Sequence, residues 1–193
     1  MEGKVLYIIS GCNGAGKTTA SYTVLPEVLE CREFVNADEI AKGLSPFNPE
    51  SVAIDAGRLM LQRIQELLRM NETFSIETTL STKSYRNLVN KAHKQGYQVK
   101  LIFFWLDTPE TAMNRVAQRV SEGGHGIPTE TIIRRYYAGI DNFFRIYMNL
   151  VDYWLLINNT TGTSEYVAEG GGKMDTVIFD CNTFNQIKRY VRE

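Results

Sequence analysis

Residues 11–18 of this chain read GCNGAGKT, which matches the phosphate-binding pattern G-x-x-x-x-G-K-[ST] at every fixed position. The residues before it, 4–10 (KVLYIIS), are apolar and rich in β-formers, which predicts a buried strand. The residues from 18 onward (TTASYTVLPEVLE) predict a helix. A phosphate-binding loop lies between a strand and a helix, so this context supports the motif.

The residue types of this loop, the P-loop, predict how a nucleotide is held. Glycines let the backbone adopt conformations that side chains forbid, so consecutive N–H groups can turn inward around an anion. The following helix adds the positive end of its dipole. Lys17 is predicted to reach the β- and γ-phosphates, and the Thr18 hydroxyl is predicted to ligate Mg²⁺. The residues expected to bind the nucleotide here are Gly11, Asn13, Gly14, Ala15, Gly16, Lys17, Thr18 and Thr19.

The composition is that of an ordinary globular α/β protein, with 193 residues, of which 44% are hydrophobic and 22% charged. This length favours a single domain over residues 1–193. The net charge of −1 argues against a sequence-blind polyanion binder. Three cysteines without C-x-x-C spacing favour a reducing cytoplasm. The apolar stretches are too short for a signal peptide or a bilayer span, so no membrane partner is expected.

Strand and helix patterns alternate along the chain, which predicts βαβ units and right-handed crossovers. The expected fold class is therefore α/β, a three-layer P-loop NTPase of the kinase-like type with a mostly parallel central sheet. The most apolar run, residues 98–106, is expected at the centre of that sheet. Further strands are expected at 33–36, 73–77 and 152–158, and helices at 48–70, 84–94, 109 to about 123, 129–149 and 183–192. Residues 164–180 predict a hairpin at a sheet edge, so a C-terminal hairpin and helix span about 164–193.

Acids follow three predicted strands: Asp38, Glu77 and Asp107. In open α/β sheets ligands bind beyond the carboxyl ends of the strands, where a carboxylate can act as a general base, ligate Mg²⁺ or position water. For Asp38 such a role is favoured over a helix N-cap, because its strand is expected to neighbour the P-loop strand. Glu77, followed by Thr78 and Thr79, is a poor core residue unless it is paired. Asp107 is interpreted as the N-cap of the next helix.

Arginines are concentrated in the two helices predicted around residues 123–126 (GGHG): Arg115, Arg119, Arg134, Arg135 and Arg145. Two helices joined by a glycine-containing tip predict a lid over the nucleotide, spanning about 109–149. Arg115 and Arg119 are four residues apart and share one helix face, and Arg115 is assigned to the nucleotide.

Arginines on such a lid can neutralise the charge of a transferring phosphoryl group, and the alternative is a solvated basic face. Both readings stay open for Arg119 and Arg134, whereas the solvated face is favoured for Arg135 and Arg145. His125 is interpreted as a polar loop residue, with phosphate contact as the alternative.

Several motifs follow one another in an order that resembles the zeta-toxin-like P-loop kinases, a family also described as predicted ABC-type ATPases. The motifs are the P-loop, Asn36-Ala37-Asp38-Glu39-Ile40-Ala41, Ile76-Glu77-Thr78-Thr79-Leu80-Ser81, Arg115-Val116-Ala117-Gln118-Arg119-Val120, Gly123-Gly124-His125 and Ile133-Arg134-Arg135-Tyr136. The resemblance covers nearly the whole chain. The P-loop alone is generic, whereas the order of the other motifs is specific to this group.

The resemblance implies an ATP-dependent, Mg²⁺-dependent kinase that phosphorylates a hydroxyl group, built on a five-stranded parallel core. In zeta toxins the acceptor is the 3′-hydroxyl of UDP-N-acetylglucosamine, and the activity poisons cell-wall synthesis. The resemblance implies that Asp38 accepts the acceptor proton, that Glu77 positions the acceptor, and that Arg119 and Arg134 act on the phosphates with Lys17.

The acceptor-binding set expected from these motifs is Asp38, Glu77, Thr78 and Thr79. This chain has the Asn-Ala-Asp and Glu-Thr-Thr forms, and the sugar-contacting residues of the toxins do not map onto it. No helical segment precedes the first predicted strand, so an antitoxin is expected as a separate chain.

Two other functions compete with a small-molecule kinase. A GTPase-type switch needs Asn-Lys-x-Asp, but the nearest match, residues 90–93 (NKAH), lacks the acid, and no Asp-x-x-Gly follows the P-loop. A nucleic-acid end kinase would share the P-loop and the base but would need a basic channel, against which the net charge of −1 argues weakly. The small-molecule kinase is therefore favoured.

Overall fold

The computed structural model describes residues 3–27, 29–124, 126–172 and 174–191. His125, whose role the sequence left between loop residue and phosphate contact, lies outside the described residues, as does Arg192 at the expected end of the last helix. The strands are β1 (Val5–Gly11), β2 (Glu33–Val35), β3 (Phe74–Thr78), β4 (Gln98–Trp105), β5 (Tyr153–Asn158), β6 (Glu165–Gly171) and β7 (Met174–Ile178). The helices are α1 (Lys17–Glu27), α2 (Ala37–Leu44), α3 (Ala53–Met70), α4 (Tyr85–Lys94), α5 (Pro109–Ser121), α6 (Thr129–Asn142) and α7 (Cys181–Lys188), with a 3₁₀ turn η1 (Pro49–Val52) and a π-helical turn η2 (Phe143–Tyr147).

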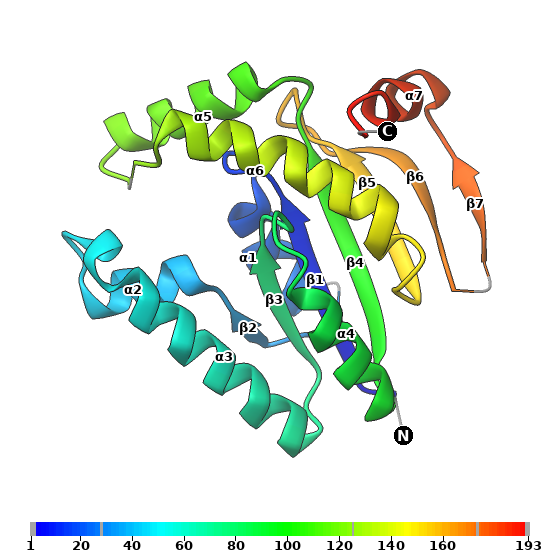
Figure 1. The fold of residues 1–193 in the computed structure, drawn as a ribbon, viewed down its shortest axis with the longest axis horizontal. Helices are drawn as coiled ribbons and strands as arrows, with labels where there is room; N and C mark the ends of the chain where they lie inside the picture. Colours follow the sequence, from blue (N-terminus) through cyan, green and yellow to red (C-terminus); the bar gives the residue numbers. More distant parts are fainter. Residues whose placement is uncertain (1–2, 28, 125, 173, 192–193) are drawn as a thin grey trace.

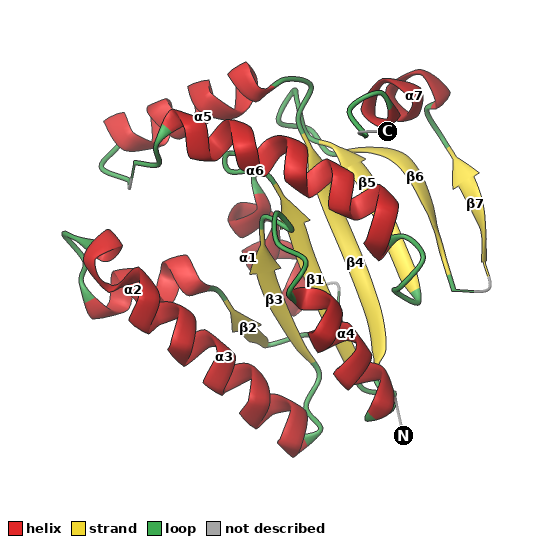
Figure 2. Ribbon diagram, in the orientation of Figure 1, coloured by secondary structure: helices red, strands yellow, loops and turns green. Residues whose placement is uncertain are grey.

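The described strands form one seven-stranded sheet in the order β2-β3-β1-β4-β5-β6-β7. The five strands from β2 to β5 pair in parallel, and β6 and β7 continue the sheet antiparallel as an edge hairpin. Figure 1 shows α4 and α6 in front of this sheet and α1 behind it, and Figure 2 shows the strands between red helices. The expected fold class, the central place of β4 and the edge hairpin are therefore confirmed.

One expectation about the sheet is wrong. The strand before Asp38, β2, was expected beside β1, but β3 lies between them, with Ile8 opposite Ile76 on one side and Val35 opposite Ile76 on the other. β2 has only three residues, and Glu33 and Phe34 are half-buried, which suits a sheet edge. β1 is buried along its whole length and takes the inner position. Glu77, at the end of β3, is therefore closer to the P-loop strand than Asp38 is.

Two predicted helix starts differ in detail from the structure. The segment expected as a helix from Asn48 begins with η1, and Asn48 makes no side-chain capping bond, so α3 starts only at Ala53. Before α5 the N-cap is Thr108 and not Asp107, because the Thr108 hydroxyl accepts the Thr111 N–H at 3.1 Å. The Asp107 carboxylate instead accepts the Thr108 N–H at 2.9 Å.

The helix predicted over 129–149 is also divided. Its regular part, α6, ends at Asn142, and η2 widens the last turn through Phe143–Tyr147. Within η2, Phe143 is fully buried and packs edge-on against Trp154 of β5, with ring centroids 5.6 Å apart. The wider turn carries this ring into the core, and the Asn142 amide donates to the Leu80 carbonyl at 2.8 Å. The first contact holds η2 against β5, and the second joins the end of α6 to the segment that follows β3.

No helix among the described residues has the length and apolar content that a bilayer span requires.

Candidate nucleotide and acceptor site

The P-loop has the backbone that its glycines predicted. Gly11, Gly14 and Gly16 have φ values of +138°, +79° and +83°. A Cβ on Gly11 would lie 2.2 Å from the Phe104 carbonyl oxygen, a backbone atom of the neighbouring strand β4. No side chain fits in that space, so this position requires glycine.

Two residues far along the chain hold the loop in this shape. Asn159, which follows β5, is 8% exposed and donates its amide to the Ala15 carbonyl at 2.8 Å. Its Nδ2 would lie 2.6 Å from a Cβ on Gly16, so the amide occupies the space beside that glycine. Asn159 was not predicted as a site residue from the sequence, although its place after a predicted strand was a usable signal.

Arg115 braces the same region from α5. Its guanidinium donates to the carbonyls of Asn159 and Thr160 at 2.9 and 2.8 Å, and to the Gly14 carbonyl at 3.4 Å. These contacts join the P-loop to the turn after β5. The nucleotide contact assigned to Arg115 from the sequence stays a prediction, and the contacts with protein atoms support the loop itself.

Glu77 contacts Lys17 and Thr18, the side chains that the motif assigns to phosphate and metal binding. The Thr18 hydroxyl donates to Glu77 Oε2 at 2.9 Å, and Lys17 Nζ lies 3.8 Å from Glu77 Oε1. Lys17 is 6% exposed and also donates to the Cys12 carbonyl at 2.8 Å. Lys17 and Thr18 are therefore the partners that the partly buried Glu77 carboxylate needs. The next P-loop residue, Thr19, lies exposed in the first turn of α1.

Burial raises the pKa of the Glu77 carboxyl group, Lys17 and the Thr18 hydroxyl oppose this shift, and Asp38 and Glu39 add to it. A carboxyl group whose pKa is higher in the folded than in the unfolded chain destabilises the folded state as the pH rises through that pKa. Ionisation of Glu77 therefore lowers the stability of the folded state relative to the unfolded chain.

Glu77→Gln is expected to raise the melting temperature of the nucleotide-free protein at pH 8. The gain should shrink as the pH is lowered, because wild-type Glu77 then takes up its proton. Thermal melting followed by circular dichroism between pH 4.5 and 8 measures the difference. Glu66→Gln, on the partly exposed side of α3, serves as the control for the same chemical change away from the P-loop. A lower melting temperature for Glu77→Gln at pH 8 would mean that the contact with Lys17 outweighs burial.

Asp38 is not the helix N-cap that the sequence offered as its alternative. Asn36 caps α2, since its side-chain oxygen accepts the N–H groups of Asp38 at 2.8 Å and Glu39 at 3.4 Å. The Asp38 carboxylate is thus in the first helical turn, where the helix dipole favours negative charge. Its side chain lines a chamber of about 180 Å³ that it shares with Lys17 and Glu77. The full lining of this chamber is Asn13, Lys17, Asn36, Ala37, Asp38, Met60, Glu77, Thr78, Thr79, Tyr85 and Arg135.

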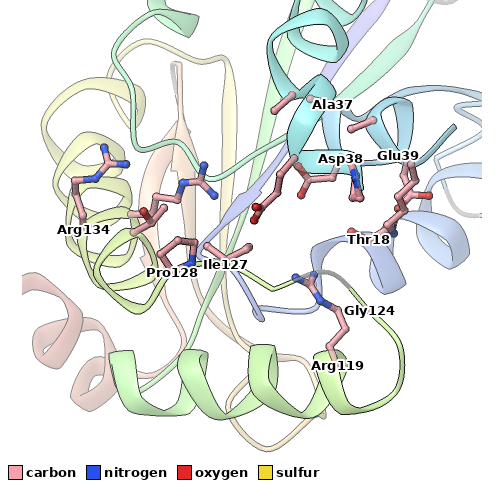
Figure 3. A pocket seen from close by; sticks show the side chains of 16 residues that line it. Thr18, Ala37, Asp38, Glu39, Arg119, Gly124, Ile127, Pro128 and Arg134 are labelled. Carbon is pink, nitrogen blue, oxygen red and sulfur yellow. Dashed lines mark hydrogen bonds and ion pairs between the residues drawn. The ribbon is translucent and has the colours of Figure 1, made fainter. Parts of the chain in front are cut away.

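A larger cavity of about 570 Å³ lies between α2 and the helices α5 and α6. Figure 3 shows Asp38 and Glu39 on the α2 side, with Arg119 and Arg134 coming from the two helices opposite. Thr18 lines this cavity too, so the P-loop reaches both spaces. Residues predicted separately from the sequence, namely Thr18, Asp38, Arg119 and Arg134, are therefore brought to one cavity.

The interpretation of Arg135 as a solvated surface residue is wrong. Its side chain is half-buried, lines both cavities and donates to Asn13 Oδ1 of the P-loop at 3.3 Å. Arg134, the next residue on α6, is exposed, because successive helical residues point about 100° apart. Arg145 is exposed beside Asp141, at 3.9 Å, as the sequence suggested.

The described cysteines Cys12, Cys31 and Cys181 are free thiols, in agreement with their spacing.

The chain matches the family model described as Zeta toxin over residues 2–167. Over 136 residues it is 29% identical to an uncharacterized protein of Haemophilus influenzae, a match that covers 70% of this chain and 94% of that protein.

Three groups of solved structures are similar to the whole architecture or most of it. The complex AvrRxo1-ORF1:AvrRxo1-ORF2 with sulphate ions matches with a TM-score of 0.77 at 17% identity, over 99% of this chain and 65% of that chain. A chain of the PezAT toxin–antitoxin system of Streptococcus pneumoniae matches with a TM-score of 0.68 at 14% identity, over 99% and 79%. A gluconokinase from Sinorhizobium meliloti matches with a TM-score of 0.51 at 14% identity, over 80% and 82%. These likenesses show a P-loop kinase fold, and this chain spans about two thirds of the AvrRxo1 chain.

Proposed function

We propose that this chain, which belongs to the zeta toxin family and is a P-loop phosphotransferase, transfers the γ-phosphoryl group of ATP to a hydroxyl group of a small molecule. The observation that carries the proposal is that P-loop residues and Asp38 together line two adjoining cavities. Lys17 and Asp38 line the small chamber, and Thr18 and Asp38 line the large cavity. A triphosphate on the P-loop would therefore meet an acceptor next to a carboxylate.

The P-loop would hold the phosphates of ATP. Backbone N–H groups of the P-loop and the start of α1 would form the anion site, and Lys17 would supply a positive charge within it. A solved neighbour of the same fold, the AvrRxo1-ORF1:-ORF2 complex with ATP, matches with a TM-score of 0.75 and supports the choice of nucleotide.

The residues beside the P-loop fit Mg²⁺. The Thr18 hydroxyl and the Glu77 carboxylate, 2.9 Å apart, are hard oxygen donors of the kind that Mg²⁺ prefers. Among the described residues, no three His, Cys, Asp or Glu side chains cluster as a metal site, so phosphate oxygens and water would complete the coordination. Bound Mg²⁺ would neutralise charge on the β- and γ-phosphates. This role for Glu77 is added to the acceptor contact that the sequence suggested.

Asp38 would act as the general base. Its carboxylate would accept the proton of the acceptor hydroxyl as the acceptor oxygen bonds to the γ-phosphorus. The bond from that phosphorus to the bridging oxygen breaks, and the electron pair leaves with ADP. Arg119 and Arg134, on the opposite wall, would neutralise charge on the phosphoryl oxygens.

The large cavity would bind the acceptor. Its volume of about 570 Å³ lies in the range of small-molecule sites, and its walls combine cations, acids and apolar groups such as Ile127 and Pro128. Thr78 and Thr79, in the chamber beside Glu77, would complete the acceptor contacts. We propose a nucleotide sugar such as UDP-N-acetylglucosamine as the first acceptor to test.

Incubation with Mg²⁺ and ATP labelled at the γ-phosphate is expected to yield a labelled small molecule. The panel of acceptors should include nucleotide sugars, nucleosides and oligonucleotides, with the products separated by chromatography. Label on a nucleotide sugar would support the first choice, whereas label only on oligonucleotide ends would favour the nucleic-acid kinase. Label only in inorganic phosphate at every acceptor concentration would contradict the proposed transfer.

We propose in addition that the chain acts in the cytoplasm as one domain, and that a separate antitoxin protein controls it. The free cysteines support the location. The PezAT neighbour, described as a toxin–antitoxin system, supports the partner.

A further inference from the structure

Arg135 lies where the two cavities meet. The residues that line both cavities are Ala37, Asp38 and Arg135, and of these only Asp38 and Arg135 carry a charge. Arg119 and Arg134 line the large cavity but not the chamber that contains Lys17. A phosphoryl group passing from the P-loop to an acceptor near Asp38 would therefore cross the space in front of Arg135.

The structure around Arg135 fixes its position. Its guanidinium donates to Asn13 Oδ1 at 3.3 Å, and Asn13 is a P-loop residue that is only 5% exposed. Its helix is fixed as well, because the Tyr136 hydroxyl donates to the Leu106 carbonyl at 2.7 Å. On the same helix, a Cβ on Gly139 would lie 2.7 Å from the Thr79 carbonyl oxygen, so α6 approaches the end of β3 very closely.

The Arg135 guanidinium is partly desolvated and lies near both a carboxylate and a second arginine. Burial lowers the pKa of Arg135, the nearby Asp38 carboxylate opposes this effect, and Arg134 adds to it. A guanidinium has five N–H donors in a planar fork, so the bond to Asn13 leaves donors for phosphoryl oxygens. A partly desolvated arginine also interacts more strongly with developing charge than an exposed one does.

We propose that Arg135 is a catalytic residue that contacts the phosphoryl group during transfer, and that Asn13 is its positioning residue. The inference rests on the proposed phosphotransfer and adds a residue to it. In the step, the acceptor oxygen bonds to the γ-phosphorus while the bond to the ADP oxygen breaks, and the acceptor proton goes to Asp38. Arg135 takes part without forming a covalent bond, by stabilising the negative charge on the phosphoryl oxygens.

The first test needs no acceptor. Binding of the non-hydrolysable analogue AMP-PNP and of ADP, each with Mg²⁺, is measured by calorimetry for the wild type, Arg135→Met and the control Arg145→Met. Arg135→Met is expected to weaken AMP-PNP about tenfold and ADP less than about twofold, since only AMP-PNP carries a γ-phosphate. Arg145→Met, on the exposed side of η2, should change neither.

Equal losses for both nucleotides, or no loss for either, would overturn the contact. This result is independent of the acceptor, so it distinguishes loss of the γ-phosphate contact from failure of the label-transfer experiment, which would overturn the proposed function and with it the catalytic role of Arg135. Melting temperatures of the variants, measured in parallel, show whether each is folded. Arg135→Lys, which keeps the charge and the stem, replaces Arg135→Met if the latter does not fold.

The second test uses the labelled acceptor. Arg135→Lys is expected to lower kcat about 100-fold with little change in KM for ATP, because lysine cannot reproduce the fork. Asn13→Ala should lower kcat about tenfold, and the double variant should be no slower than Arg135→Lys alone. Effects that multiply in the double variant would overturn the positioning role of Asn13. Partial recovery of Arg135→Ala by added guanidinium, which should not stimulate the wild type, is expected of a contact in the reacting complex.

Discussion

Replacing Asp38 with asparagine is expected to lower the rate of phosphoryl transfer by about 10³- to 10⁴-fold. Asparagine keeps the size and the place in the first turn of α2, where Asn36 still caps the helix. It removes the basic oxygen that would accept the acceptor proton. ATP affinity should stay within about threefold, because the P-loop contacts do not depend on Asp38. Steady-state transfer of γ-label, together with calorimetric titration of ATP, measures both quantities.

Asp55→Asn provides the matched control for this experiment. Asp55 lies exposed in the first turn of α3, paired with Arg58 at 3.3 Å, and the same change there should leave the transfer rate unaltered. Near-wild-type turnover of Asp38→Asn would show that another group removes the proton. A parallel loss of ATP binding would assign Asp38 to the nucleotide instead.

Gly11→Ala is expected to destabilise the protein by at least about 3 kcal/mol and to abolish nucleotide binding. The new methyl group would lie 2.2 Å from the Phe104 carbonyl oxygen, and residues 11 and 104 are directly paired in the neighbouring strands β1 and β4. Neither strand can move without breaking the centre of the sheet. The φ of +138° adds backbone strain for any residue with a side chain. Denaturant unfolding and binding of a fluorescent ATP analogue measure the two effects.

Gly57→Ala tests whether this effect is specific to the site. Gly57 lies within α3, and no atom would approach its new Cβ within 4 Å. Alanine is favoured over glycine in helices, so this change should stabilise the protein by about 0.5–1 kcal/mol. The same substitution is thus expected to have opposite signs at the two positions. If Gly11→Ala unfolds at the same denaturant concentration as the wild type, the close approach of the two strands does not exist in solution.

The elements that sequence analysis placed well are those with local signals. The glycine spacing of residues 11–18 required positive φ at three positions, and the structure has them. The apolar run 98–106 required burial on both sides, and β4 is the central strand. Helix starts were less accurate, as Asn48 and Asp107 show, because neighbouring polar residues compete for the same N–H groups.

The candidate site was predictable only in part. Asp38 and Glu77 stood out because acids after apolar strands are costly to bury without partners. Their partners were not predictable, since the order of strands in space differs from their order in sequence. β3 took the place beside β1, which brought Glu77 to Lys17 and Thr18. Asn159 and Arg135 were missed or dismissed, because each meets the P-loop across more than 120 residues of chain.

The sequence by itself determined that this chain has a phosphate-binding loop between a strand and a helix, on a mostly parallel α/β sheet. The loop depends on residues within one or two turns of each other, and the sheet type depends on the alternation of strand and helix patterns along the chain, so both can be recognised from the sequence. Only the tertiary structure decided which of two adjacent arginines on α6 faces the P-loop, and which acid lies beside Lys17. Those choices depend on how α6 and β3 pack against the sheet, and packing joins residues whose spacing in sequence carries no signal.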